Sequence, residues 1–124
     1  MKFKRPRAAR YPFVAPATVT DLESGRQTQE STSDLSLFGC QVVPGNSIPS
    51  GTRVRIQILH GGESFEAWGR VTHIRPIMGA GIVFTKIEEQ CQSVLDKWIA
   101  VLRDNKVTRQ NVSTRCRNQA NRLE

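Results

Sequence analysis

The middle of this chain is a succession of short segments in which apolar and polar residues alternate, separated by turns that contain glycine. The clearest segment is residues 52–59 (TRVRIQIL), where Val54, Ile56 and Ile58 recur at every second position. That period places one set of side chains on the same face of a half-buried strand. Residues 60–63 (HGGE) follow, and because glycine tolerates a positive φ they suit a tight hairpin. The pattern therefore predicts β-hairpins in series.

Six segments of the chain have the character of strands. They are residues 12–22, 26–33, 37–43, 52–59, 64–74 and 81–87. Short strands at this turn spacing indicate an antiparallel barrel or sandwich. Pro12 and Pro16 cannot donate backbone hydrogen bonds, so they favour an edge or bulged position for the first strand.

Residues 88–103 carry the strongest helical pattern in the sequence. Apolar residues fall on one stripe, at positions 87, 91, 94, 95, 98 and 102. Acidic residues open the segment and Arg103 closes it, as the helix dipole prefers. We expect this helix to lie across one end of the barrel, with Trp98 as a main packing contact. Residues 106–124 have only scattered apolar residues, which predicts a flexible tail.

The net charge of +7 is unevenly distributed over the 124 residues, a length that suits one domain. Residues 1–10 carry five basic residues and no acidic one (+5). Residues 11–105 carry eight basic and ten acidic residues (−2), and residues 106–124 carry five basic and one acidic (+4). A uniformly basic face for nucleic acid is therefore not expected. Nucleic-acid binding through the two basic ends is the less favoured alternative.

Several other classes of protein find no support in the sequence. No apolar run approaches the ~18–20 residues of a membrane span, and no apolar segment follows the basic N-terminus as a signal peptide requires. Three cysteines without a CxxC spacing indicate reduced thiols in the cytoplasm, with Cys40 and Cys91 buried as small apolar residues. His60 and His73 fit no metal-ligand spacing. Without a nucleophile motif or phosphate loop either, we predict no enzyme, metal or cofactor.

A cluster of arginines, Arg5, Arg7 and Arg10, stands directly before the first strand. Guanidinium groups grip phosphate through two parallel hydrogen bonds and stack on flat bases. The cluster therefore indicates an arm that binds an anion. The alternative is a solvated basic arm that improves solubility.

A second motif, DLSLFG at residues 34–39, lies between two predicted strands. On an extended segment Asp34 and Ser36 point the same way, so that a carboxylate and a hydroxyl can reach one ligand. Gly39 permits close approach of the backbone or a bend with positive φ at a bulge. The alternative is that Asp34 and Ser36 only form a turn between strands.

Together these features resemble the PilZ domain family. The resemblance rests on the arginines, on DLSLFG, on the run of short strands closed by GAGIVF at residues 79–84, and on the final amphipathic helix. It implies a mainly β fold, a six-stranded antiparallel β-barrel with a C-terminal α-helix. The expected units are a basic arm at residues 1–10, the barrel and helix at residues 11–105, and a basic tail at residues 106–124.

Many PilZ domains are bacterial receptors for cyclic di-GMP, so the resemblance implies this ligand and relay of its binding to an unidentified protein effector. In the family an RxxxR motif and a [D/N]xSxxG motif wrap the dinucleotide. Asp34, Ser36 and Gly39 match the second motif in full, and Arg10 looks like the second arginine of the first motif. The first arginine does not match, because Pro6 stands four residues before Arg10.

Two interpretations follow from that mismatch. In the first, a neighbour of Pro6 replaces the missing arginine. The ligand-binding set that the resemblance then implies is Arg5, Arg7, Arg10, Asp34, Ser36 and Gly39. In the second, the domain is a degenerate scaffold that binds protein partners without nucleotide.

Overall fold

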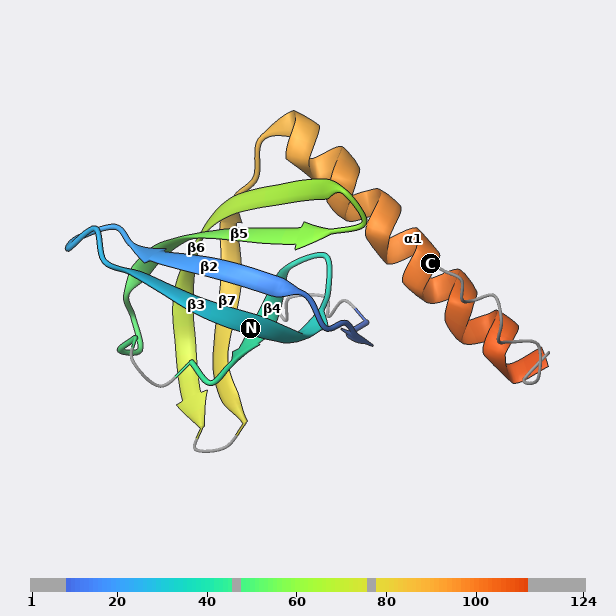
Figure 1. Ribbon diagram of the computed structural model, residues 1–124, viewed down its shortest axis with the longest axis horizontal. Coiled ribbons are helices and arrows are strands. Elements are labelled where there is room, and N and C mark those ends of the chain that lie inside the picture. Colours follow the sequence, from blue (N-terminus) through green and yellow to red (C-terminus); the bar gives the residue numbers. More distant parts are fainter. Residues whose placement is uncertain (1–8, 46–47, 76–77, 112–124) are drawn as a thin grey trace, which may run out of the picture.

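The computed structural model describes residues 9–45, 48–75 and 78–111, which form seven strands and one helix. The elements are β1 (Tyr11–Pro12), β2 (Pro16–Asp21), β3 (Gln27–Leu35), β4 (Gly39–Val43), β5 (Arg53–His60), β6 (Glu63–Arg75), β7 (Gly79–Lys86) and α1 (Glu89–Asn111). Figure 1 shows the strands gathered into one body and α1 running diagonally past one end of it.

Six of the strands close into an antiparallel barrel. Neighbouring strands follow the order β3-β2-β5-β6-β7-β4, and β4 pairs in turn with β3, which completes the ring. The two-residue strand β1 adds to β3 from outside the ring, with Tyr11 opposite Leu35. The structure therefore confirms the predicted six-stranded barrel with a C-terminal helix, and it excludes the sandwich.

The barrel interior is filled by the apolar set that the alternation predicts. Val54, Ile56 and Ile58 of β5 are fully buried, and so are their β6 neighbours Phe65 and Ala67. Each of the Val, Ile and Phe side chains contributes ~1.5–3 kcal/mol when it leaves water. The interior is packed with side chains, so any ligand site has to lie on the outside.

The first strand differs from the prediction in its position. β2 pairs with β3 on one side and with β5 on the other, so it is a central strand rather than an edge strand. The predicted segment also splits into β1 and β2. Pro12 ends β1 and Pro16 begins β2, so neither proline stands in the middle of a ladder that would need its N–H.

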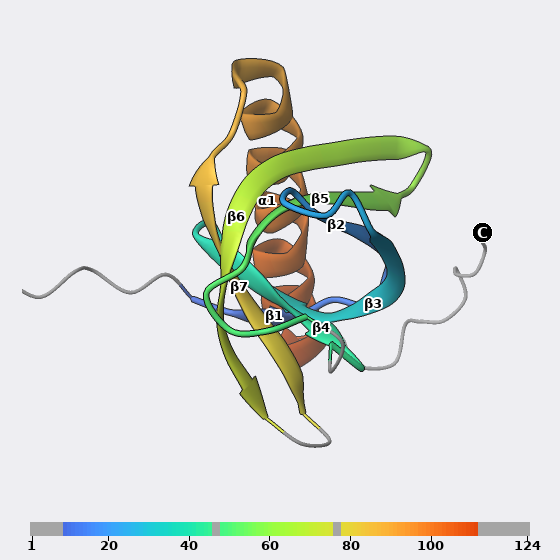
Figure 2. The same cartoon turned by 90° about the vertical axis from the view of Figure 1, so that its left-hand side faces the viewer.

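Helix α1 packs against the barrel through its first half. Leu95, Trp98 and Ile99 are buried, and the helix contacts β6 and β1. Viewed along the other axis, α1 stands behind the strands (Figure 2). The helix continues to Asn111 and does not end at Arg103 as predicted, so residues 106–111 of the expected flexible tail are helical. The apolar stripe ends before Arg103, but no proline or glycine follows within the helix to stop it. The rest of that tail, residues 112–124, lies outside the described residues.

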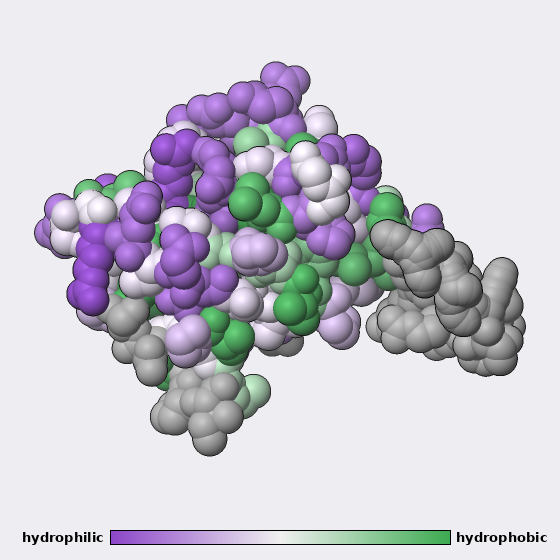
Figure 3. All heavy atoms as spheres, in the orientation of Figure 1, coloured by the Kyte–Doolittle hydropathy of each residue, from purple (hydrophilic) through white to green (hydrophobic). Residues whose placement is uncertain are grey.

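The surface is mostly hydrophilic. On the face shown in Figure 3, apolar residues form small patches separated by hydrophilic ones. Within the described ranges, no helix combines the length and the apolar character needed to cross a membrane.

Candidate ligand-binding site

The candidate site begins at an irregularity in β3. The pairing of β3 with β4 shifts register between Thr32 and Asp34, which marks a β-bulge at Ser33. Thr32 and Leu35 are buried, whereas Ser33 and Asp34 between them are both partly exposed. The bulge therefore turns two consecutive polar side chains to the outside of the barrel.

Asp34 meets Arg10 at this point. The Nη2 atom of Arg10 lies 3.6 Å from Oδ1 of Asp34, and the two side chains are 54% and 28% exposed. Oδ1 accepts no hydrogen bond from the part of the chain that the structure describes. The contact is thus a loose ion pair without a hydrogen bond, in which Oδ1 is shielded from solvent. The half-exposed guanidinium group of Arg10 and the exposed part of the Asp34 side chain remain open to a ligand.

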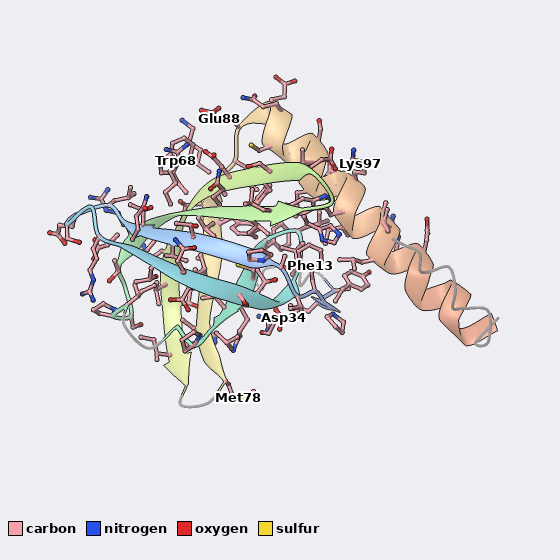
Figure 4. The ribbon with its side chains drawn as sticks, viewed as in Figure 1. Phe13, Asp34, Trp68, Met78, Glu88 and Lys97 are labelled. Atoms are coloured by element: carbon pink, nitrogen blue, oxygen red, sulfur yellow. The ribbon has the colours of Figure 1, made fainter. Side chains whose placement is uncertain are left out.

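A surface hollow of about 450 Å³ lies beside this pair. Its lining residues are Arg10, Ser33, Asp34, Gln41, Val43, His73 and Met78. Figure 4 shows Asp34 on β3 and Met78 at the outer end of the β6–β7 hairpin. The volume falls in the range of ligand sites, which is ~300–1,000 Å³.

The β6–β7 hairpin forms the second wall of the hollow. The side-chain amide of Gln41 donates a hydrogen bond of 2.7 Å to the carbonyl oxygen of Met78, which ties this hairpin to β4. A second bulge, between Val71 and His73, breaks the inward alternation of β6 and leaves His73 at the hollow. The sequence pattern predicted His73 only as a strand residue, and it gave no signal for Gln41 or Ser33.

Ser36 does not face the hollow with Asp34, which corrects the expected pairing of a carboxylate with a hydroxyl. The extended segment ends at Leu35, and Ser36 is buried in the turn that follows. Its Oγ accepts hydrogen bonds from the N–H groups of Phe38 and Gly39 and donates to the carbonyl oxygen of Gly39. For Ser36 the turn alternative therefore describes the structure.

Gly39 is required for close approach and not for a positive φ. A Cβ atom at Gly39 would collide with the carbonyl oxygen of Ile82 on β7. Positive φ values occur at other glycines, among them Gly45 and Gly79, but not at Gly39. Of the two expected uses of this glycine, close backbone packing is the one found.

Cys40 lies on β4 next to this turn and is 1% exposed. Burial raises the pKa of the Cys40 thiol to about 12 from an ordinary value of 9.0. The Asp34 carboxylate adds to this rise, while Arg10 acts in the opposite direction. Cys40 is thus a neutral apolar residue as predicted, whereas Cys91 is half-buried against the core.

Arg5 and Arg7 lie outside the described residues, so their place relative to the hollow is not assigned. Within residues 9–45, 48–75 and 78–111, no cluster of three or more His, Cys, Asp or Glu side chains is arranged to hold a metal ion.

The sequence of the chain matches a family model. The PilZ domain model aligns with residues 3–100, which is most of the chain and includes both the arginine cluster and the Asp34 turn. This chain belongs to the PilZ domain family. A comparison with curated proteins finds no match to it.

Solved structures share the fold of this PilZ domain at low sequence identity. The inhibitor of motility MotI/DgrA from Bacillus subtilis aligns with a TM-score of 0.63 at 18% identity, covering 84% of this chain and 53% of its own. This chain thus spans about half the length of that protein.

Two isolated PilZ domains match over nearly their whole length. The PilZ domain of YcgR from Escherichia coli, solved with c-di-GMP, has a TM-score of 0.63 at 15% identity and covers 90% of this chain and 99% of its own. The PilZ domain of CeSA from a cellulose-synthesizing bacterium has a TM-score of 0.58 at 20% identity, with coverages of 79% and 98%. These likenesses show a shared fold.

Proposed function

We propose that this PilZ domain is a bacterial, cytoplasmic receptor for cyclic di-GMP, and that it relays binding to a protein effector without catalysing a reaction. The observation that carries the proposal is the meeting of Arg10 and Asp34 beside a surface hollow. The family membership and the c-di-GMP bound to the related YcgR domain support the choice of ligand.

The chemistry of the ligand fits these groups. Cyclic di-GMP carries two phosphates and two guanines. The guanidinium group of Arg10 can grip a phosphate or stack on a base. The carboxylate of Asp34 can accept hydrogen bonds from the N–H groups of a guanine edge. In the proposal Arg5 and Arg7 add further phosphate contacts, and His73 and Met78 form the wall opposite Asp34.

Ser36 and Gly39 act indirectly in this proposal. The hydrogen bonds of Ser36 hold the turn that follows Asp34, and Gly39 lets that turn sit close against β7. Both residues are thus positioning residues for Asp34. Their part in the motif is to fix the backbone from which the carboxylate projects.

Calorimetric titration of the full chain with cyclic di-GMP tests the proposal. We expect binding at micromolar concentration or tighter, weakened ten- to a hundredfold in Arg10→Ala and in Asp34→Ala, because each loses a charge-assisted contact worth ~1.5–3 kcal/mol. Arg26→Ala and Glu23→Ala remove matching charges from the exposed β2–β3 turn and serve as controls.

No heat at millimolar ligand would overturn the proposal, as would equal binding by all four variants. The first outcome, absence of heat, would favour the degenerate-scaffold alternative, whereas equal binding would place the nucleotide elsewhere on the chain. The degenerate-scaffold alternative predicts that a protein partner is recovered equally well with and without the nucleotide.

A further inference from the structure

The tip of the turn that carries the Asp34 motif exposes two apolar side chains. Leu37 is 37% exposed and Phe38 is 51% exposed. Among the exposed large apolar residues of the described ranges, Phe38 is the one aromatic residue. Full burial of an exposed Phe side chain is worth ~1.5–3 kcal/mol, and Phe38 still has about half of that to gain from a partner, because it is 51% exposed.

Hydrogen bonds hold the backbone of this turn in place. The N–H of Phe84 donates a 2.8 Å hydrogen bond to the carbonyl oxygen of Phe38, and the N–H of Ser36 donates one of 2.9 Å to Gly39. The Ser36 hydroxyl adds its own bonds inside the turn. An exposed aromatic ring on a fixed backbone loses little conformational entropy when it binds, which is typical of a contact residue.

A hollow of about 300 Å³ opens beside Phe38. Phe84 and Ile87 supply its apolar wall, and both pack from the other side onto the core. We call Leu37, Phe38, Phe84 and Ile87 the loop-tip patch. Leu37 and Phe38 themselves line the hollow together with this wall. A half-exposed ring on the rim of such a hollow allows self-association, because the ring of one copy can pack into the hollow of another.

The charges at the edge of the hollow are self-complementary too. Lys86 and Asp96 both line it. Neither forms an ion pair with any residue that the structure describes. The Nζ atom of Lys86 lies 5.4 Å from the centre of the Trp68 ring, and Asp96 accepts a hydrogen bond from the side-chain amide of Gln92. Figure 4 shows Trp68 on β6 and Glu88 just before the start of α1. One patch thus offers one cation and one anion around an apolar centre.

We propose that the loop-tip patch is the contact of a twofold-symmetric dimer of this chain. In such a dimer Phe38 of each copy packs into the hollow of the other, and Lys86 of each copy faces Asp96 of the other. A twofold axis through the apolar centre satisfies both pairings at once. Because residues 11–105 sum to −2, the folded body adds little repulsion, and salt screens the basic ends.

Sedimentation of the full chain at physiological salt tests the dimer. As concentration rises from about 10 μM to about 1 mM, the range of weak self-association, we expect the mass to rise from 13.9 kDa toward twice that value. Phe38→Asp removes the half-exposed ring and should stay monomeric. Leu59→Asp, at a residue 48% exposed on β5, is the matched control and should dimerise like the wild type.

Charge reversal tests the twofold geometry. In a dimer of either single variant, Lys86→Glu or Asp96→Lys, both contacts between residues 86 and 96 bring like charges together. Each variant should therefore self-associate more weakly than the wild type, by roughly tenfold or more. When the two variants are mixed, each contact of the mixed dimer unites opposite charges, so association should recover. Circular dichroism verifies that each variant is folded.

A wild type that stays monomeric at the highest concentration would overturn the proposal. It would also fail if Leu59→Asp, and not Phe38→Asp, abolished the dimer, or if the mixed charge variants did not recover. None of these measurements uses nucleotide, so their result is independent of cyclic di-GMP binding.

Discussion

Ser36 illustrates how one side chain shapes the site without touching the hollow. Its hydroxyl is the hydrogen-bond partner of two backbone N–H groups and one carbonyl in the turn between β3 and β4. Each of these groups sits in a partly buried place where water cannot fully replace the hydroxyl. This turn fixes the backbone next to Asp34, which lies near the end of β3, and it carries Phe38 at its tip.

Ser36→Ala should therefore destabilise the protein. Removing the hydroxyl leaves the N–H groups of Phe38 and Gly39 without this partner, at a cost of about 1–3 kcal/mol. Urea unfolding followed by circular dichroism measures the change in the free energy of unfolding. Ser64→Ala, at an exposed position on β6, is the control and should stay within ~0.5 kcal/mol of wild type. Equal stability of the two variants would show that the hydroxyl group of Ser36 does not stabilise the turn.

The site residues that the sequence predicted and those that it missed differ in a physical way. Arg10 and Asp34 were found because their charge and spacing are visible in the sequence itself. Ser33 and His73 reach the hollow because bulges in β3 and β6 break the alternation that the prediction assumes. Where a strand bulges depends on its register with its neighbours, and a two-residue period carries no signal for it.

At the scale of elements, the β5–β6 hairpin and α1 are joined by Glu63. One carboxylate oxygen of Glu63 accepts a 2.6 Å hydrogen bond from Nζ of Lys97, and the other accepts one of 3.4 Å from the indole N–H of Trp98. Trp98 packs in turn on Phe13, which Figure 4 shows between the barrel and the helix. The two hydrogen bonds join segments about 35 residues apart, and together with the ring contact they hold the helix against the barrel end.

This link predicts a pH dependence of stability. The hydrogen bond from Lys97, assisted by its charge, lowers the pKa of Glu63 below its ordinary value of 4.5. The unfolded chain therefore binds the proton more readily, and the stabilisation is present above pH 4.5 and lost as pH falls through the lowered pKa. Unfolding free energies of wild type and Glu63→Gln should differ at neutral pH and converge as pH falls below 4.5 and through the lowered pKa of Glu63.

Glu23→Gln, in the exposed β2–β3 turn, is the control for this pH series and should follow the wild type. A difference between wild type and Glu63→Gln that stays constant over the whole pH range would show that Glu63 acts by packing and not by its charge.

At the scale of the whole molecule, the topology followed from strand count, hairpin turns and one helix, because each of these is a local property of the sequence. Closure of the barrel could not be predicted from local pattern. The barrel closes because β3 pairs with β4, and the alternation of apolar residues does not say which strands pair. The family resemblance supplied that closure. The predicted end of α1 was wrong because the apolar stripe on which it rested ends before the helix does, and the helical backbone continues to Asn111.

Ligand binding at the outside of a closed barrel should stabilise the entire fold. The proposed contacts join the segment before β1 to β3 and to the β6–β7 hairpin, so unfolding of the barrel would release the ligand. At a concentration of cyclic di-GMP one hundred times the dissociation constant, the free energy of unfolding should rise by about 2.7 kcal/mol. For a chain of this size that corresponds to a rise in Tm of about 10 °C.

Thermal unfolding with and without cyclic di-GMP measures this shift. Asp34→Ala should show a smaller shift at the same ligand concentration, equivalent to about 0.4–1.4 kcal/mol for binding weakened a hundred- to tenfold. Glu23→Ala should shift like the wild type, because its carboxylate lies in the β2–β3 turn and does not line the hollow. An identical shift in Asp34→Ala would mean that the nucleotide binds elsewhere on the chain. A shift that 5′-GMP reproduces at equal concentration would mean that the site does not require the cyclic dinucleotide, because one guanine and one phosphate would then suffice.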